Sequence, residues 1–214
     1  SMIIADRMKK NPVTATPDMS IKEASEKMKQ NKAHRLPVLD DDKHLVGIIS
    51  EKDILLAAPS PASTLSAYEI NYLLSKLTVK NIMSRNPLTI TKETTIEEAV
   101  KLMVENDLSC LPVMEDGFLA GIVSKSDMFK ILLEMLGDKH SGVRVEALVN
   151  DKVGVVAELA EKLREKGINI ISWGTLDGSS AGTKVLTFKV ENATVAQVKE
   201  IFKPVSISLD VRDI

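Results

Sequence analysis

The sequence predicts an α/β (α+β) protein in which two similar repeats pack as a pseudo-symmetric pair, followed by a ferredoxin-like βαββαβ domain. The main observation is an internal repeat, because Gly47 to Asp53 returns as Gly121 to Asp127, 74 residues later. Leu-Pro-Val and Asn-Pro-Val/Leu-Thr segments recur at nearly the same offset, and the tail has a different rhythm. One repeat is small for a stable core, so we expect the two to pack face to face and form a cleft with two related pockets.

The sequence of the first repeat predicts five elements in the order strand, helix, strand, strand and helix. Its first helix should open with a capping box, in which Ser20 accepts from the amide of Glu23 and Glu23 reaches back. The predicted elements are an extended piece 12–16, a helix from residue 20, a strand 35–39, an acidic turn 40–43, a strand 45–49 and a helix from Ser50.

The second repeat copies this order. Its predicted elements are an extended piece 88–90, a helix 95–105, a strand 110–114, a turn 115–117, a strand 118–123 and a helix from Ser124. The Pro- and Ser-rich stretch 58–63 separates the repeats. A linker helix is expected near 66–77, with Tyr68, Tyr72 and Leu73 packing against a repeat or a partner subunit.

The tail alternates as a strand over 143–149 and then turns at 150–154 into an amphipathic helix. The remaining predicted elements are a strand 168–173, a hairpin loop 174–182, a strand 184–190, a helix 194–202 and a strand 205–211. We therefore expect a first repeat over 2–58, a linker over 59–78, a second repeat over 79–137 and a tail domain over 142–214.

Composition argues against several functions. The net charge is −2 and aromatic residues make up 3% of the chain, so neither a basic nor a stacking surface for nucleic acid is expected. The single cysteine, Cys110, lies in an apolar run and predicts a buried thiol in a reducing cytoplasm. No apolar run approaches a membrane span. The histidines His34, His44 and His140 are scattered along the sequence, so no metal site is expected. The sequence also shows no pairing of a nucleophile with a general base, so an enzyme is not expected.

The repeats resemble a tandem pair of CBS domains (a Bateman module), through the paired Gly-x-x-Ser-x-x-Asp, Leu-Pro-Val and Asn-Pro segments. The tail resembles an ACT domain through residues 151–154 and 167–170, although Val153 stands where ACT domains commonly have proline. The order of these parts resembles the acetoin-utilisation protein B family. The resemblance implies a cytoplasmic regulatory homodimer that senses an adenosine-containing metabolite, with AMP, ADP or ATP ahead of NAD or S-adenosylmethionine.

The residues alone leave two interpretations of the repeated Ser and Asp. Ser50 and Asp53 can simply start a helix, with no ligand involved. Two such starts beside one cleft also form an anion site, with a carboxylate placed for a ribose diol. The resemblance implies the second role, with Asp53 and Asp127 on ribose hydroxyls and Ser50 and Ser124 near phosphate.

The resemblance also implies that each pocket takes its Ser and Asp from one repeat and its opposite wall from the other. The first predicted pocket comprises Thr16, Ala33, His34, Arg35, Ile122, Ser124, Ser126 and Asp127. The second comprises Ile48, Ser50, Asp53, Thr91, Leu108, Ser109 and Cys110. Because His34 and Arg35 are cationic partners for phosphate, the first pocket should prefer a charged nucleotide. The alternative is that Arg35 pairs with the acidic turn Asp40 to Asp42.

For the tail, the resemblance implies a small-molecule loop at Asn150, Asp151, Gly154 and Asn169. A tight turn without a ligand, in a domain that only dimerises, is the alternative. A rival to the sensor as a whole is a scaffold subunit with vestigial pockets that binds an unidentified regulated protein.

Overall fold

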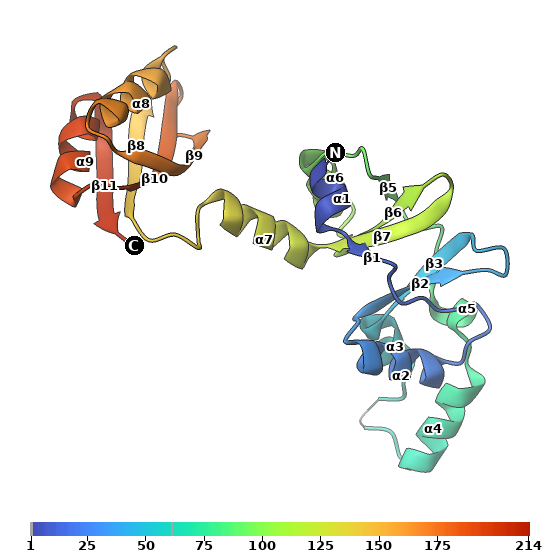
Figure 1. Ribbon diagram of the computed structural model, residues 1–214. Coiled ribbons are helices and arrows are strands. Elements are labelled where there is room, and N and C mark those ends of the chain that lie inside the picture. The colour runs from blue at the N-terminus through green and yellow to red at the C-terminus, as the bar shows by residue number, and fades with distance from the viewer. Residues whose placement is uncertain (1, 61) are drawn as a thin grey trace. The chain divides into compact units, whose positions relative to one another are not determined.

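The structure of the protein, a computed structural model, describes residues 2–60 and 62–214. By its internal contacts the chain forms two compact units, one ending at Met128 and one beginning at Phe129 (Figure 1). The elements from the start of the chain to α7 are α1 (Met2–Arg7), β1 (Lys9–Lys10), α2 (Ile21–Asn31), β2 (Arg35–Leu39), β3 (Leu45–Ser50), α3 (Glu51–Ala57), α4 (Ala67–Lys76), α5 (Val79–Ile82), β4 (Ser84–Arg85), β5 (Ile90–Thr91), α6 (Ile96–Glu105), β6 (Cys110–Glu115), β7 (Phe118–Ser124) and α7 (Lys125–Met135).

The two repeats complete each other's sheets. In each repeat a β-hairpin, β2–β3 or β6–β7, forms the centre of the sheet. The short strand β1 of the first repeat pairs with β7 of the second, and β4 of the second pairs with β3 of the first. The other side of each hairpin takes a parallel partner from its own repeat, through Ala15 against Val38 and through β5 against β6. The predicted α/β pair is therefore confirmed, but its mutual strand exchange was not predicted.

The repeated glycines lie where the exchanged strands cross the hairpins. A Cβ on Gly47 would lie 2.6 Å from the sulfur of Met83 and 2.8 Å from the carbonyl oxygen of Ser84. A Cβ on Gly121 would meet Met8 and the carbonyl of Lys9 at the same two distances. Glycine recurs at this position because the other repeat's backbone leaves no space for a side chain.

Capping side chains start the helices that follow the hairpins and those that precede them. Ser20 accepts from the amide of Glu23 at 3.1 Å, but within the described part of the chain Glu23 does not return the bond, so the predicted capping box is only half present. Helix α2 then packs its apolar face on the first hairpin. The core of this repeat consists of Ala15, Ile21, Ala24, Met28, Leu36, Val38, Ile49 and Val79.

The predicted linker helix is present as α4, which begins at the N-cap Ser66. The predicted contact residues Tyr68, Tyr72 and Leu73 are 79%, 55% and 42% exposed, and the helix packs against the core of the first repeat through Leu74 instead. A partner subunit as their contact remains a prediction. Across the described residues, no helix has both the length and the apolar character needed to span a membrane.

The second unit has the predicted βαββαβ order in an antiparallel sheet whose strand order is β11-β8-β10-β9. Helices α8 and α9 cover one face of this sheet (Figure 1). The elements are β8 (Val143–Asn150), α8 (Val155–Glu165), β9 (Asn169–Asp177), β10 (Thr183–Glu191), α9 (Val195–Phe202), the 3₁₀ turn η1 (Lys203–Val205) and β11 (Ser206–Asp213).

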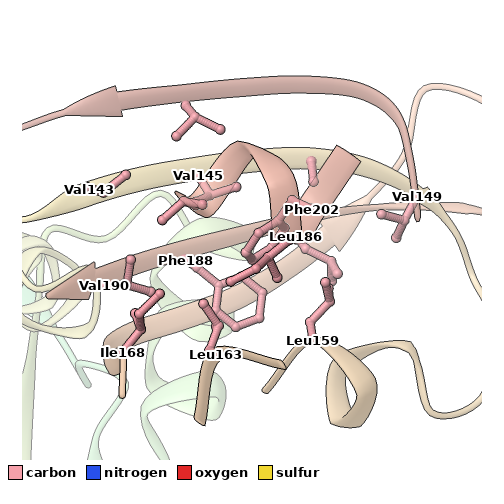
Figure 2. Close-up of a cluster of buried hydrophobic side chains, with 14 residues drawn as sticks. Val143, Val145, Val149, Leu159, Leu163, Ile168, Leu186, Phe188, Val190 and Phe202 are labelled. Atoms are coloured by element: carbon pink, nitrogen blue, oxygen red, sulfur yellow. The ribbon is translucent and has the colours of Figure 1, made fainter. Parts of the chain in front are cut away.

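The core of the second unit lies between the helices and this face. Figure 2 shows Leu159 and Leu163 of α8 and Phe202 of α9 against the strand residues. The rings of Phe188 and Phe202 meet edge to face with centroids 5.3 Å apart. Because side chains alternate along a strand, Arg144 on β8 and Lys189 on β10 belong to the other face of the sheet.

Candidate functional site

Two cavities lie beside the repeated Ser-x-x-Asp segments of the first unit, and they are called here the Asp127 pocket and the Asp53 pocket. Their volumes are about 200 and 250 Å³. Each takes its Ser and Asp from one repeat and most of its opposite wall from the other. This arrangement follows from the strand exchange, because β1 and β4 carry each repeat's N-terminal segment to the other hairpin.

A capping box holds each aspartate in place. The backbone amide of Ser124 donates to Oδ2 of Asp127 at 2.8 Å, and the amide of Asp127 donates to the Ser124 hydroxyl at 3.2 Å. The same pair of bonds joins Ser50 and Asp53, at 2.9 and 3.1 Å. In the described part of the chain, Oδ1 of neither aspartate accepts a hydrogen bond. Each carboxylate therefore starts a helix through Oδ2, and its Oδ1 accepts no bond from the described residues, so the helix-start interpretation and the ligand interpretation are compatible.

The structure brings the predicted residues of the Asp127 pocket together, except Thr16 and Ser126, which lie off its wall. The predicted residues on the wall are Ala33, His34, Arg35, Ile122, Ser124 and Asp127. The rest of the wall was not predicted for this pocket and consists of Lys9, Pro12, Val13, Lys32 and Cys110.

The Asp53 pocket likewise contains its predicted residues except Thr91. Those on the wall are Ile48, Ser50, Asp53, Leu108, Ser109 and Cys110. The wall also contains residues that were not predicted for it, namely Arg35, Ser84, Pro87, Leu88 and Asp107.

The two walls correspond residue by residue through the repeat, so their differences stand out. Lys32 of the Asp127 pocket occupies the position of Asp107 in the Asp53 pocket, and both have left-handed backbones with φ near 50°. Lys9 corresponds to Ser84. The Asp127 pocket thus combines three cations with one carboxylate, whereas the Asp53 pocket combines one cation with two carboxylates. The predicted inequality of the pockets therefore has a basis in Lys9, Lys32 and Asp107, beyond the two residues the sequence singled out.

Arg35 does not pair with the acidic turn. Within the described residues it forms no ion pair, and its side chain lines both pockets. Asp40 instead accepts from the amides of Asp42 and His44 at 3.0 and 2.8 Å and lies 3.6 Å from the His44 ring nitrogen. The alternative role of Arg35 is therefore wrong, and its guanidinium is available to a ligand.

His34 already has a partner. Its Nδ1 lies 3.0 Å from Oε2 of Glu51 at the start of α3, with 75% of the His34 side chain exposed. The backbone carbonyl of His34 also accepts from the amide of Glu51 at 3.0 Å. A phosphate would have to compete with Glu51 for this ring, which makes Lys32 and Arg35 the stronger cationic contacts.

Burial raises the pKa of the Cys110 thiol, and the nearby charge of Arg35 opposes this with a smaller effect. Cys110 therefore remains a protonated thiol at neutral pH, as its predicted burial implies. The cysteine contributes shape rather than charge to both pockets.

Asp40, Asp42 and His44 come together at the β2–β3 turn with ligand atoms within 4.8 Å of one another. The sequence predicts no metal site at these residues. The hydrogen bonds of Asp40 to the turn's own backbone account for the grouping, and exposed acidic groups of this kind are common without an ion.

The predicted small-molecule loop of the tail is only partly assembled. Gly154 caps α8 with φ at +87°, and no atom lies within 4 Å of the place of a Cβ, so the residue is needed for the turn and not for a close approach. Asn150 pairs with Thr183 at the start of β10, whereas Asn169 pairs with Glu191 at its end. Asn169 therefore lies at the opposite end of the sheet from the loop at 150–154.

The model of the CBS domain family matches residues 4–60 and 79–134. A CBS domain-containing protein of Dictyostelium discoideum is 34% identical over 136 residues, which cover 63% of this chain and 94% of that protein. The crystal structure of CBSX2 in complex with AMP is 32% identical with a TM-score of 0.52 and covers 62% of this chain and 97% of that one; CBSX2 is from Arabidopsis thaliana. The CBS domain pair of protein MJ0100, in complex with 5-methylthioadenosine and S-adenosyl-L-methionine, is 28% identical with a TM-score of 0.51, covering 64% and 97%.

Proposed function

We propose, from the premise that this chain belongs to the CBS-domain family, that it is a non-catalytic regulatory protein whose Asp127 pocket binds an adenine nucleotide. The observation that carries the proposal is the pair of corresponding pockets in which Lys32 and Asp107 reverse the charge. AMP, ADP and ATP are the favoured ligands of the Asp127 pocket, because Lys9, Lys32 and Arg35 supply cations for phosphate oxygens.

The adenosine part of the ligand has suitable contacts in the same pocket. The free Oδ1 of Asp127 is an acceptor for a ribose hydroxyl, and Val13 and Ile122 provide apolar surface for a base. Two of the solved CBS structures that resemble this chain are complexes, one with AMP and one with 5-methylthioadenosine and S-adenosyl-L-methionine. These ligands share an adenosine group and differ in charge.

The Asp53 pocket is proposed to bind a less charged adenosine derivative, or the same nucleotide more weakly. Its Asp107 carboxylate lies where the other pocket has Lys32, so a phosphate there would meet a like charge. Thioether-containing adenosine derivatives such as 5-methylthioadenosine avoid this repulsion.

Isothermal titration with AMP, ADP, ATP, NAD, 5-methylthioadenosine and S-adenosylmethionine tests the proposal. Asp127→Asn is the informative variant, because asparagine retains an acceptor for the Ser124 amide but presents a donor to the ribose. The matched variant is Asp53→Asn. We expect Asp127→Asn to lower the affinity for the nucleotide by roughly 10-fold or more, whereas Asp53→Asn should leave this affinity unchanged. Equal affinities in the wild type and in both variants would remove the ribose role from these residues.

Thermal unfolding with the same ligands gives a second measurement. A ligand present at about 100 times its dissociation constant should add roughly 2.7 kcal/mol to the free energy of unfolding, and therefore raise the midpoint by about 5–10 °C. If no nucleotide shifts the midpoint, the sensor function is replaced by the alternative, a scaffold subunit with vestigial pockets. A stoichiometric protein partner should then bind whether or not nucleotide is present. Hydrolysis of ATP by the purified chain would contradict the non-catalytic assignment.

The proposal includes a homodimer. Leu55 and Leu56 on α3 are 75% and 77% exposed, and Tyr68 on α4 is 79% exposed, which supports an apolar contact with a second copy. Sedimentation of the wild type and of Leu56→Glu tests this, with a shift toward monomer expected for the variant.

The second unit is proposed to act as an ACT domain, supported by its βαββαβ order and by the turn at Gly154. It would bind a small molecule such as an amino acid near Asp151, or hold the oligomer together. Titration with a panel of amino acids distinguishes these roles. The link to acetoin utilisation and the cytoplasmic location rest on the resemblance in sequence, and growth on acetoin after deletion of the coding gene tests the former.

A further inference from the structure

The second unit contains a cavity of about 610 Å³, more than twice the volume of either pocket of the first unit. It lies over the sheet face that α8 and α9 leave uncovered, under the segment that joins α7 to β8. This volume lies within the roughly 300–1,000 Å³ typical of small-molecule sites. We call this cavity the Lys189 pocket. Its wall includes Leu133, Leu136, Lys139, Arg144, Ser172 and Lys189.

Lys189 is a buried charge without a counter-ion. Its side chain is only 8% exposed, and its Nζ donates one hydrogen bond, of 2.7 Å, to the carbonyl oxygen of Gly137. Among the residues the structure describes, no carboxylate forms an ion pair with it. An ammonium group has three donors, and lysines are rarely this buried unless paired. Burying a charged ammonium group without a negative partner costs free energy, and a bound anion would lower that cost.

The cross-strand neighbours of Lys189 do not neutralise its charge. Arg144 lies directly opposite on β8, and Ser172 lies directly opposite on β9. Arg144 is already balanced by Glu146 at 2.9 Å and by Asp210 at 3.7 Å, so it offers no unsatisfied charge. In the described chain Lys139 has no ion-pair partner either, and the one carboxylate side chain on the wall, Asp138, pairs with neither lysine. Lys139 and Lys189 are therefore the two wall lysines that have no ion-pair partner among the described residues.

The pocket is built on a fixed segment. Gly137 has φ at +70°, and a Cβ there would lie 2.9 Å from the Ile171 side chain. A Cβ on Gly142 would lie 2.3 Å from the carbonyl oxygen of Val190. The segment above the cavity is therefore packed closely against β9 and β10 at both of its ends.

We infer that the Lys189 pocket binds a small organic anion, with a carboxylate or phosphate on Lys189 and Lys139 and a short apolar group against Leu133 and Leu136. The charged end receives donors from Lys189 and the Ser172 hydroxyl, and the half of the wall nearer α7 is apolar. The site is separate from the predicted loop at 150–154, because Arg144 and Lys189 lie near the opposite end of β8 from Asn150. It is also independent of the nucleotide proposal, since it shares no residue with either pocket of the first unit.

The test uses the full chain and four probes: isovalerate, its neutral isostere isovaleramide, acetate and inorganic phosphate. Binding is followed by two-dimensional amide NMR, which also locates the site through the signals of Ser172 and Lys189. Isovalerate should bind more tightly than acetate, and isovaleramide should not bind. Tighter binding of phosphate than of isovalerate would identify a phosphate ester as the natural class, whereas equal binding of isovalerate and isovaleramide would overturn the inference.

Lys189→Met removes the charge and keeps a long apolar stem, and we expect the dissociation constant for isovalerate to rise on the order of 10-fold or more. Lys199→Met, on the exposed surface of α9, is the matched control and should leave the affinity unchanged. Lys139→Gln provides a second variant at an exposed position, with a smaller loss expected. If Lys189→Met lowers the unfolding midpoint but binds isovalerate as the wild type does, Lys189 serves only to hold Gly137 and the inference fails.

Discussion

Arg35 and Cys110 occupy corresponding positions of the two repeats, and each of them lines both pockets of the first unit. They lie at the starts of β2 and β6, where the pseudo-symmetry of the pair brings the two strands near each other. The charge of Arg35 also acts on the Cys110 thiol, whose pKa it lowers against the larger effect of burial. One cation therefore serves two cavities, so the pockets are not electrically independent.

Replacing Arg35 with glutamine should weaken nucleotide binding in both pockets. The guanidinium is the only cationic side chain on the described wall of the Asp53 pocket, so the loss there should be roughly 10-fold or more. Titration calorimetry of Arg35→Gln combined with either Asp127→Asn or Asp53→Asn assigns the loss of affinity to one pocket or the other. An effect confined to the Asp127 pocket would mean that Arg35 is turned away from Asp53 in solution.

Exchanging the charges of Lys32 and Asp107 should exchange the preferences of the pockets. In the double variant Lys32→Asp/Asp107→Lys, the Asp53 pocket gains a phosphate partner and the Asp127 pocket acquires a like charge. We expect ATP to bind in the Asp53 pocket of this double variant. Adding Asp53→Asn should then reduce the affinity for ATP, and adding Asp127→Asn should leave it unchanged. Raising the salt concentration should weaken the charged ligand in either protein. Unchanged site preference would show that Lys32 and Asp107 do not set the selectivity.

Gly121→Ala should destabilise the first unit by about 1–3 kcal/mol. The new methyl group would meet the sulfur of Met8 at 2.6 Å and the backbone carbonyl of Lys9 at 2.8 Å, and the carbonyl cannot move without breaking the β1–β7 pairing. Denaturant unfolding measures the change. Gly174→Ala is the control, because its Cβ would meet only the Thr187 methyl at 3.6 Å, an ordinary contact.

Cys110 should react slowly with iodoacetamide at neutral pH and faster as the pH rises, because burial raises the pKa of its thiol and the thiolate is the nucleophile. Arg35→Gln should slow the reaction further, since removing a positive neighbour raises the thiol pKa again. A nucleotide bound in either pocket should protect the thiol. Mass spectrometry of the alkylated fraction over time measures these rates, and a faster reaction in Arg35→Gln would show that the guanidinium acts by covering the sulfur.

The sequence allowed the main elements of the fold to be predicted because its signals are local. Ser50, Ser66, Thr95 and Thr194 each act as an N-cap at or beside the predicted helix start, and the alternation of β8 is visible in its residues. The exchanged strands β1 and β4 were missed because two-residue strands made of Lys9–Lys10 and Ser84–Arg85 carry no hydrophobic pattern. Their existence depends on pairing with the other repeat.

Many residues of the two pocket walls followed from the repeat and its resemblance, and the omissions and errors have separate causes. Lys9 reaches the Asp127 pocket only because β1 crosses to the other hairpin. Lys32 was not assigned from the sequence, although placing it on Asp107 through the repeat offset would have revealed the charge reversal. Asn169 was grouped with the loop at 150–154 from sequence likeness alone, and the sheet register separates them.

The exchange of β1 and β4 also bears on how this half of the protein can be divided. Each repeat on its own would expose an unpaired hairpin edge whose complement lies in the other repeat. A cut in the connection between α3 and α4 would therefore leave two fragments that hold each other without a covalent link. Either fragment alone would seek a second copy of itself to supply the missing strand, which is the arrangement expected of an ancestor that had only one repeat per chain.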